Sequence, residues 1–174
     1  MHRVKAVNLP VGSQMPALFG VRADFQDAWS APLEVWHPTM PELFFALFGH
    51  HPVGAKWLLI LRNRIAAACG LATPDDADIL RPEQRAIYAV GETIGPWPIF
   101  ALAADELIAG RDNAHLDFRV SILRERTEAG GRVTVTTRCH THGWPGRVYL
   151  WVIAPFHKAG VRGLLARAAR AGRI

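Results

Sequence analysis

The sequence has only two cysteines among its 174 residues, Cys69 and Cys139, and no CxxC spacing joins them. Both lie between apolar neighbours, so we expect small buried hydrophobes rather than a disulfide. No uncharged apolar run approaches the roughly 18 residues that a membrane-spanning helix needs. The opening residues also lack the basic start and apolar stretch of a secretory signal. These absences predict a cytoplasmic protein that does not span a membrane.

Sequence motifs of three common chemistries are missing as well. The chain contains no GxSxG, no reactive-cysteine signature and no phosphate-binding loop. It also has no GxGxxG to open a dinucleotide-binding unit. Hydrolase, thiol and nucleotide chemistry therefore have no support from motifs, and we predict no cofactor.

Acidic residues are absent from the last quarter of the chain. Residues 129–174 hold 8 Lys and Arg and no acid, whereas residues 1–128 hold 12 basic and 15 acidic residues. Such asymmetry can attract nucleic acid, anionic lipid or an acidic ligand. The basic residues are spread over several expected elements, however, and the aromatic interleaving of RNA-binding sheets does not accompany them. We therefore favour arginines that solvate one end of the fold, and we predict no nucleic-acid partner.

Half of the residues are hydrophobic, and the length is near the common size of one domain. We expect a single domain over residues 1–174, in which residues 1–20 are irregular. Phe25–Ala31 is the first expected strand. Thr39 and Glu42 then form a capping box, which predicts a helix over about Met40–Phe48 that Gly49 ends in the left-handed conformation.

The middle of the chain mixes one helix signal with proline-rich segments. Apolar residues at helical spacing predict a second helix over 53–69. The prolines and acids of residues 73–92 predict a loop. A strand over Ile99–Ala103 and a helical turn over Asp105–Gly110 follow.

Three long strands and a closing helix are expected in the last part of the chain. The strands cover about His115–Arg126, Arg132–His142 and Arg147–Ala154, with four-residue loops rich in Gly and Pro between them. Pro155 ends the third strand, and a helix follows over about 156–171. The sheet is therefore expected to be antiparallel.

Counting residues from the two expected loops assigns each side chain to one of two sheet faces. One face is apolar and includes Phe118, Val120, Ile122, Cys139, Val148, Leu150 and Val152. The other is polar and includes His115, Asp117, Arg119, Arg138, His140, His142, Tyr149 and Trp151. In this register Asp117 lies opposite His142 and Arg119 opposite His140. The helices are the available cover for the apolar face, which predicts a two-layer fold with a cavity between the layers.

Short strings spaced along the chain carry a family resemblance. They are Pro52 with Trp57, Leu61-Arg62-Asn63, Gly70-Leu71, Glu106-Leu107 with Gly110, HLDFR at 115–119, Gly146-Arg147 with Tyr149-Leu150, and PFH at 155–157. Together they resemble, over roughly residues 20–170, the family catalogued as domain of unknown function 2867. HLDFR and PFH are the more specific strings.

That family resembles the START-like, birch-allergen-like helix-grip superfamily, whose long sheet wraps around a C-terminal helix and commonly encloses an apolar ligand cavity. The resemblance implies an α+β helix-grip fold. It would have a curved antiparallel sheet of about six strands, two short helices after the first strand and a C-terminal helix. Family members also occur behind nucleotide-sugar-epimerase-like domains, and this chain is expected to be the stand-alone form.

The function class that we favour is a binding protein for a small apolar or amphipathic molecule. The candidate ligand-binding residues are Arg62, Asn63, His115, Asp117, Arg119, His140, Tyr149, Trp151 and His157. Two alternatives stay open: an enzyme that uses His115, Asp117 and His140 as acid–base groups, and a non-catalytic interaction module, for example a homodimer. We predict no metal site, because Arg119 and Arg138 would repel a cation near the histidines.

Overall fold

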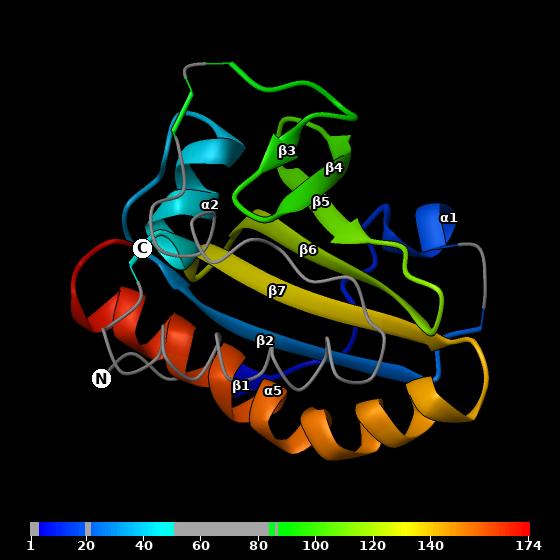
Figure 1. Cartoon of the computed structure of the whole chain (residues 1–174). Helices are drawn as coiled ribbons and strands as arrows, with labels where there is room; N and C mark the ends of the chain where they lie inside the picture. The colour runs from blue at the N-terminus through cyan, green and yellow to red at the C-terminus, as the bar shows by residue number, and fades with distance from the viewer. Residues whose placement is uncertain (1–3, 20–21, 51–83, 86) are drawn as a thin grey trace.

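The computed structural model describes residues 4–19, 22–50, 84–85 and 87–174 (Figure 1). In these residues the structure forms a sheet of seven strands in the order β1-β2-β7-β6-β5-β4-β3, and all neighbouring strands are antiparallel. The strands are β1 Lys5–Ala6, β2 Phe25–Leu33, β3 Thr93–Ile94, β4 Trp97–Leu102, β5 Glu106–Arg111, β6 Leu116–Thr127 and β7 Gly130–Thr141. The helices are α1 Met15–Phe19, α2 Met40–Phe48 and α5 Trp144–Arg170.

The fold class is the α+β class predicted from the sequence. A curved, open antiparallel sheet is combined with short helices and a long C-terminal helix, and this arrangement is consistent with a helix-grip fold. The expected second helix over 53–69, with Arg62, Asn63 and Cys69, lies outside the described residues. Residues 4–19, expected to be irregular, contain β1 and α1.

Helix α2 begins where the capping signal places it. The Thr39 hydroxyl accepts a hydrogen bond from the Glu42 backbone N–H at 3.3 Å, which satisfies one of the free donors of the first turn. The prediction for the other end is wrong: Gly49 has φ of −73° and stays in the right-handed region. Its N–H still donates to the Phe45 carbonyl at 2.8 Å.

The β6–β7 hairpin is tighter than predicted. Thr127 pairs with Gly130, which adopts φ of +114°, so only two residues form the turn. The pairing therefore moves by two residues: Asp117 lies opposite His140, and Arg119 lies opposite Arg138. Since side chains alternate with a period of two, this shift changes the partners and keeps every side chain on its predicted face.

The predicted strand over Arg147–Ala154 is wrong, because these residues form the first third of α5. β7 pairs instead with β2 on its other side. Val, Tyr, Trp and Ile favour strands, yet the packing of one helical stripe against the sheet outweighs that preference. Trp144-Pro145 was the missed signal, since proline favours the first helical turn. Pro155 lies inside the helix, which continues past it.

The predicted helical turn over Asp105–Gly110 is also wrong, because β5 occupies this segment. A six-residue segment is too short for its hydrophobic period to separate helix from strand. Gly110 permits a close approach here: a Cβ at this position would lie 2.1 Å from the Phe118 carbonyl oxygen.

The two faces of the sheet have different covers. The inner face, defined by Val120, Ile122, Val135, Leu107 and their same-face neighbours, packs against α2 and α5 to form the main core. The outer face is covered near β4 and β5 by the N-terminal segment, where Met15 packs on Ala101 and Ile108. Figure 1 shows α5 running beside β2, with α2 near its C-terminal end. Other segments of the chain therefore cover at least part of each face of the sheet.

Candidate functional site

A polar cluster lies within the otherwise apolar inner face. Along β2, the side chains that point to this face are Phe25, Asp27, Trp29, Ala31 and Leu33. Asp27 is the single acid of this series, and its side chain is only 9% exposed. Burying a carboxylate without partners costs free energy, so the groups around Asp27 indicate its role.

Asp27 lies opposite Thr137 of β7, and His157 of α5 reaches both residues. His157 Nε2 is 3.0 Å from the Thr137 hydroxyl and 3.5 Å from Asp27 Oδ1. The Trp29 indole N–H donates to the other oxygen, Asp27 Oδ2, at 3.1 Å. Asp27 Oδ1 is buried and accepts no hydrogen bond from any residue that the structure describes. This oxygen is therefore an acceptor with capacity for a further donor.

The cluster resembles a Thr-His-Asp triad only in composition. In a catalytic triad the nucleophile and the carboxylate contact opposite ring nitrogens of the histidine, which lets the ring transfer a proton between them. Here Thr137 and Asp27 both face Nε2 of His157. This geometry suits recognition of a polar group better than activation of a nucleophile.

Aromatic side chains continue from the polar cluster across the inner face. Phe118 lies next to Thr137 in the sheet, and its ring meets that of Trp97 edge to face at 5.9 Å. Trp97 in turn meets Phe48 of α2 at 5.4 Å. All three side chains are only partly buried. The inner face therefore has a polar end at α5 and an aromatic wall toward α2.

Phe25 completes the polar end on the opposite side. Its ring meets His157 edge to face at 5.8 Å and lies 5.5 Å from the Lys158 ammonium group. Below it, Leu116, Cys139 and Tyr149 form a small buried apolar cluster. Cys139 is buried, as predicted, and its thiol is not in a disulfide.

The outer face carries two separate His–Asp pairs. His142 Nε2 is 2.7 Å from Asp117 Oδ2, so this predicted pair forms across a diagonal of the sheet. His140 Nδ1 is 3.2 Å from Asp24 Oδ2 and 3.0 Å from the Arg22 carbonyl oxygen. The two imidazole rings meet edge to face at 5.1 Å. The His140 pair links the sheet to the segment before β2, and the His142 pair links the end of β7 to β6.

Asp24 is held by Thr141 as well as by His140. The Thr141 backbone N–H donates to Oδ2 at 2.7 Å and the Thr141 hydroxyl at 2.8 Å. These two bonds, then the charges of His140 and Arg147, keep the pKa of Asp24 below its ordinary value against an opposing effect of desolvation. A lowered carboxyl pKa stabilises the fold above the ordinary pKa, and this contribution disappears as the pH falls through the lowered value.

We therefore expect the stabilising effect of Asp24 to fade in acid. The difference in urea midpoint between the wild type and Asp24→Asn should be largest at about pH 5 and should shrink toward about pH 2.5. Paired urea titrations at the two pH values measure it. A difference that stays constant over this interval would contradict the assigned role of Asp24.

Arg119 is a buried structural group rather than a free member of the outer face. Its guanidinium binds both oxygens of Asp112, at 2.6 and 3.1 Å, and lies 3.5 Å above the ring of Phe100. Arg138 likewise has its guanidinium 5.1 Å from the ring of Phe19. Chain segments of the protein itself thus cover part of this face.

Seven of the nine candidate residues lie in the part of the chain that the structure describes, and the structure does not bring these seven together. Asp117, Arg119 and His140 lie on the outer face, and His115 lies in the loop before β6, where its carbonyl accepts the His142 N–H. Tyr149 is buried between α5 and the sheet, whereas Trp151 is 80% exposed on the other side of α5. Among the described candidates, His157 alone reaches the polar end of the inner face.

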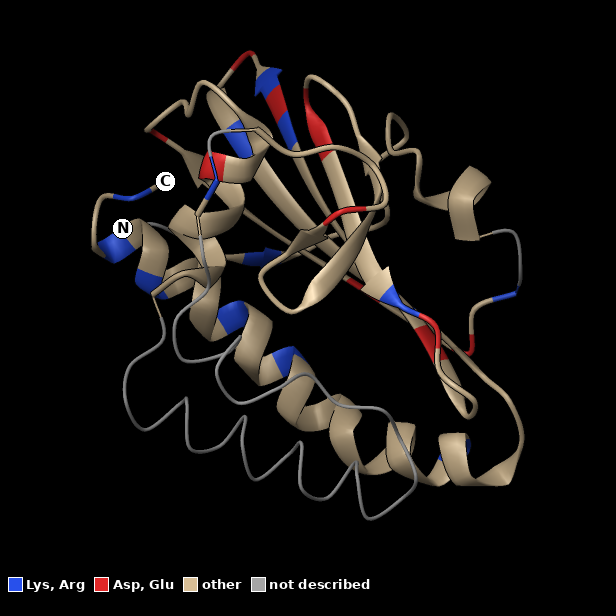
Figure 2. Cartoon of the chain, turned by 45° about the horizontal axis from the view of Figure 1, so that its top comes forward, with Lys and Arg blue, Asp and Glu red and all other residues tan. Residues whose placement is uncertain are grey.

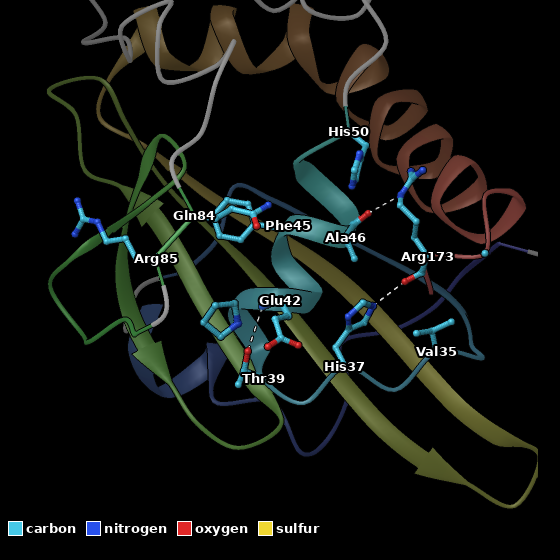
Figure 3. Close-up of a pocket in the computed structure, with 12 residues that line it drawn as sticks. Val35, His37, Thr39, Glu42, Phe45, Ala46, His50, Gln84, Arg85 and Arg173 are labelled. Carbon is cyan, nitrogen blue, oxygen red and sulfur yellow. Dashed lines mark hydrogen bonds between the residues drawn. The ribbon is translucent and has the colours of Figure 1, made fainter.

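A separate cleft of about 430 Å³ opens beside α2 (Figure 3). Its lining includes His37, Glu42, Phe45, His50 and Arg173. His37 Nε2 contacts the Arg173 carbonyl oxygen at 2.7 Å, and Arg173 Nε donates to the Ala46 carbonyl at 3.0 Å. Among the seven candidates that the structure describes, none lines this cleft. Its polar groups hold the C-terminal residues against α2.

Asp27 and Thr137 are the site residues that sequence reasoning missed. The signal for Asp27 was present in the sequence: it interrupts an apolar series at every second position of a strand. Thr137 gave no comparable signal, because threonine is common in strands. Its role depends on His157, which the fold brings over from α5.

Across the described ranges, no three His, Cys, Asp or Glu side chains gather in a group that could hold a metal ion. Among the same residues, no helix is both long and apolar enough to cross a bilayer.

Comparison with known proteins gives a family and no characterised relative. No curated protein matches the chain. The model of one family, described as "Protein of unknown function (DUF2867)", matches residues 21–164, which include strands β2 to β7 and most of α5. The chain therefore belongs to this family of proteins of unknown function.

Proposed function

We propose that the protein binds a small amphipathic molecule on the inner face of the sheet, between α5 and α2. The observation that carries the proposal is Asp27 Oδ1, a buried carboxylate oxygen with no hydrogen-bond donor among the described residues. Buried polar atoms are nearly always paired, so this oxygen is suited to a donor that a ligand brings. The resemblance to helix-grip proteins, which often bind ligands between sheet and helix, supports the same function.

The chemistry of the face indicates the class of ligand. A carboxylate oxygen that accepts no hydrogen bond within the protein can accept one from a hydroxyl or ammonium group and repels another carboxylate. Phe118, Trp97 and Phe48 offer aromatic surface to an apolar tail. The expected ligand thus has an apolar body and a hydrogen-bond-donating head that meets Asp27 and His157.

Three ligands with the same tail and different heads test this proposal. We expect decylamine and 1-decanol to bind at least about tenfold more tightly than decanoate, because a hydrogen bond to a charged group is worth about 1.5–3 kcal/mol. Isothermal titration calorimetry below the aggregation concentration of each compound measures the affinities. Equal affinities, or a preference for decanoate, would refute the assignment of Asp27.

The enzyme alternative has less support. Asp117 pairs with His142 and Asp24 with His140, and each carboxylate also accepts a backbone N–H. These contacts are those of structural links between segments, not of an acid–base pair poised above a substrate. The binding function therefore remains the proposal that the site geometry favours.

A further inference from the structure

The N-terminal half of α5 presents an exposed apolar stripe on the side away from the sheet. Its members are Trp144, Val148, Trp151, Val152 and Phe156, with exposed fractions of 75%, 54%, 80%, 47% and 63%. Their spacing of three, four and eight residues places them on one side of a helix. The opposite side of the same helix holds Tyr149, Val161, Leu164 and Leu165, which are buried. The stripe is therefore a second apolar face that the core does not use.

Basic residues border and extend this stripe. Arg147 and Lys158 lie three turns apart on one border, and Arg162 lies three turns beyond Trp151, in line with the stripe. All three are exposed. Figure 2 shows Lys and Arg along α5 and no acidic residue on this helix. The excess of basic residues in the last quarter of the sequence thus lies partly beside the apolar stripe of α5, which makes this surface both cationic and apolar.

We infer that this face of α5 docks on an anionic lipid surface. Tryptophan places an apolar ring and a polar N–H at the boundary between headgroups and acyl chains, and flanking cations attract anionic headgroups. A stripe with two tryptophans, one phenylalanine and a cationic border fits such a boundary. The inference does not depend on the ligand proposed for the inner face.

A second copy of the chain fits this face less well. In a two-fold interface the same patch meets itself, so the cationic borders of two α5 helices would come together. Because α5 carries no acid, it offers nothing to neutralise them. Anionic headgroups supply the missing charge, which favours the lipid surface.

Vesicle co-sedimentation tests the inference. The wild type should bind vesicles of phosphatidylcholine with 30% phosphatidylglycerol and not vesicles of phosphatidylcholine alone, and binding should fall at high salt. The double variant Trp151→Ala/Phe156→Ala should lose at least about tenfold in affinity for the vesicles, since it removes apolar area that docking would bury in the bilayer. Arg162→Ala should lose about fivefold. Arg162 is the cation to change, because Lys158 contacts Phe25 and Arg147 acts on Asp24.

The matched control is Val11→Ser, which removes a fully exposed apolar side chain elsewhere and should leave vesicle binding unchanged. Sedimentation equilibrium of the same proteins tests the alternative, in which a second copy of the chain covers this face of α5. No binding to anionic vesicles, or wild-type binding by the double variant, would overturn the inference. A concentration-dependent dimer that the double variant abolishes would assign the face to a second copy instead.

Discussion

Replacing Arg119 with alanine is expected to lower the free energy of unfolding by about 3 kcal/mol, among the larger effects for a polar residue. The side chain is 9% exposed, binds Asp112 through two hydrogen bonds and donates a third to the Phe118 carbonyl at 2.9 Å. Its guanidinium also packs on Phe100. Truncation removes all these contacts and leaves a void above β6. Urea unfolding measures the loss.

Asp117→Asn is the matched control on the same strand and face. Asp117 and its partner His142 are 25% and 41% exposed, so water screens their interaction. We expect a loss of at most about 1 kcal/mol. Arg119→Met keeps an aliphatic side chain of similar length, so its free energy of unfolding should lie between those of the alanine variant and the wild type. A wild-type midpoint for Arg119→Ala would show that the burial and contacts of this side chain do not stabilise this part of the sheet.

Asp27→Asn is expected to reduce the affinity for decylamine by about 10- to 100-fold while leaving the urea midpoint nearly unchanged. The amide oxygen of asparagine can still accept the Trp29 indole N–H, so the structural bond survives. The charge that would receive an ammonium head is lost. A purely structural Asp27 predicts the reverse pattern: lower stability and unchanged binding.

Asp24→Asn is the control for the loss of one negative charge, because it changes net charge by the same amount as Asp27→Asn. It removes one acid from the segment just before β2, where the Asp24 side chain pairs with His140 of the outer face and is 37% exposed. Its effect on decylamine affinity should be within about twofold, since a charge more exposed to water is well screened. If Asp24→Asn and Asp27→Asn weaken binding equally, the loss reflects net charge and not a specific contact with Asp27.

The sequence predicted the long sheet hairpin well, because its alternation of polar and apolar residues continues for twelve residues in each strand. The two-residue error in the turn changed the partners of Asp117 and Arg119 and left their face correct. Thr39 and Glu42 likewise located the start of α2, since capping is a local interaction. These features depend on neighbours in the chain.

The errors concern features that depend on distant contacts. Residues 147–154 have the composition of a strand, and only packing against β2 and β7 makes them helical. The same error placed Tyr149 and Trp151 on the polar sheet face, which they do not share. The candidate site was missed for the same reason: His157 meets Asp27 and Thr137 only after α5 has packed on the sheet.

We propose above that the inner face of the sheet holds an amphipathic molecule through Asp27. Native mass spectrometry of the wild type and Asp27→Asn, expressed and purified side by side, tests it most directly. We expect a small molecule with a hydroxyl or amino head bound to the wild type, and a clear loss of that bound mass in the variant. A wild type that carries no bound molecule and takes up neither decylamine nor 1-decanol would contradict it.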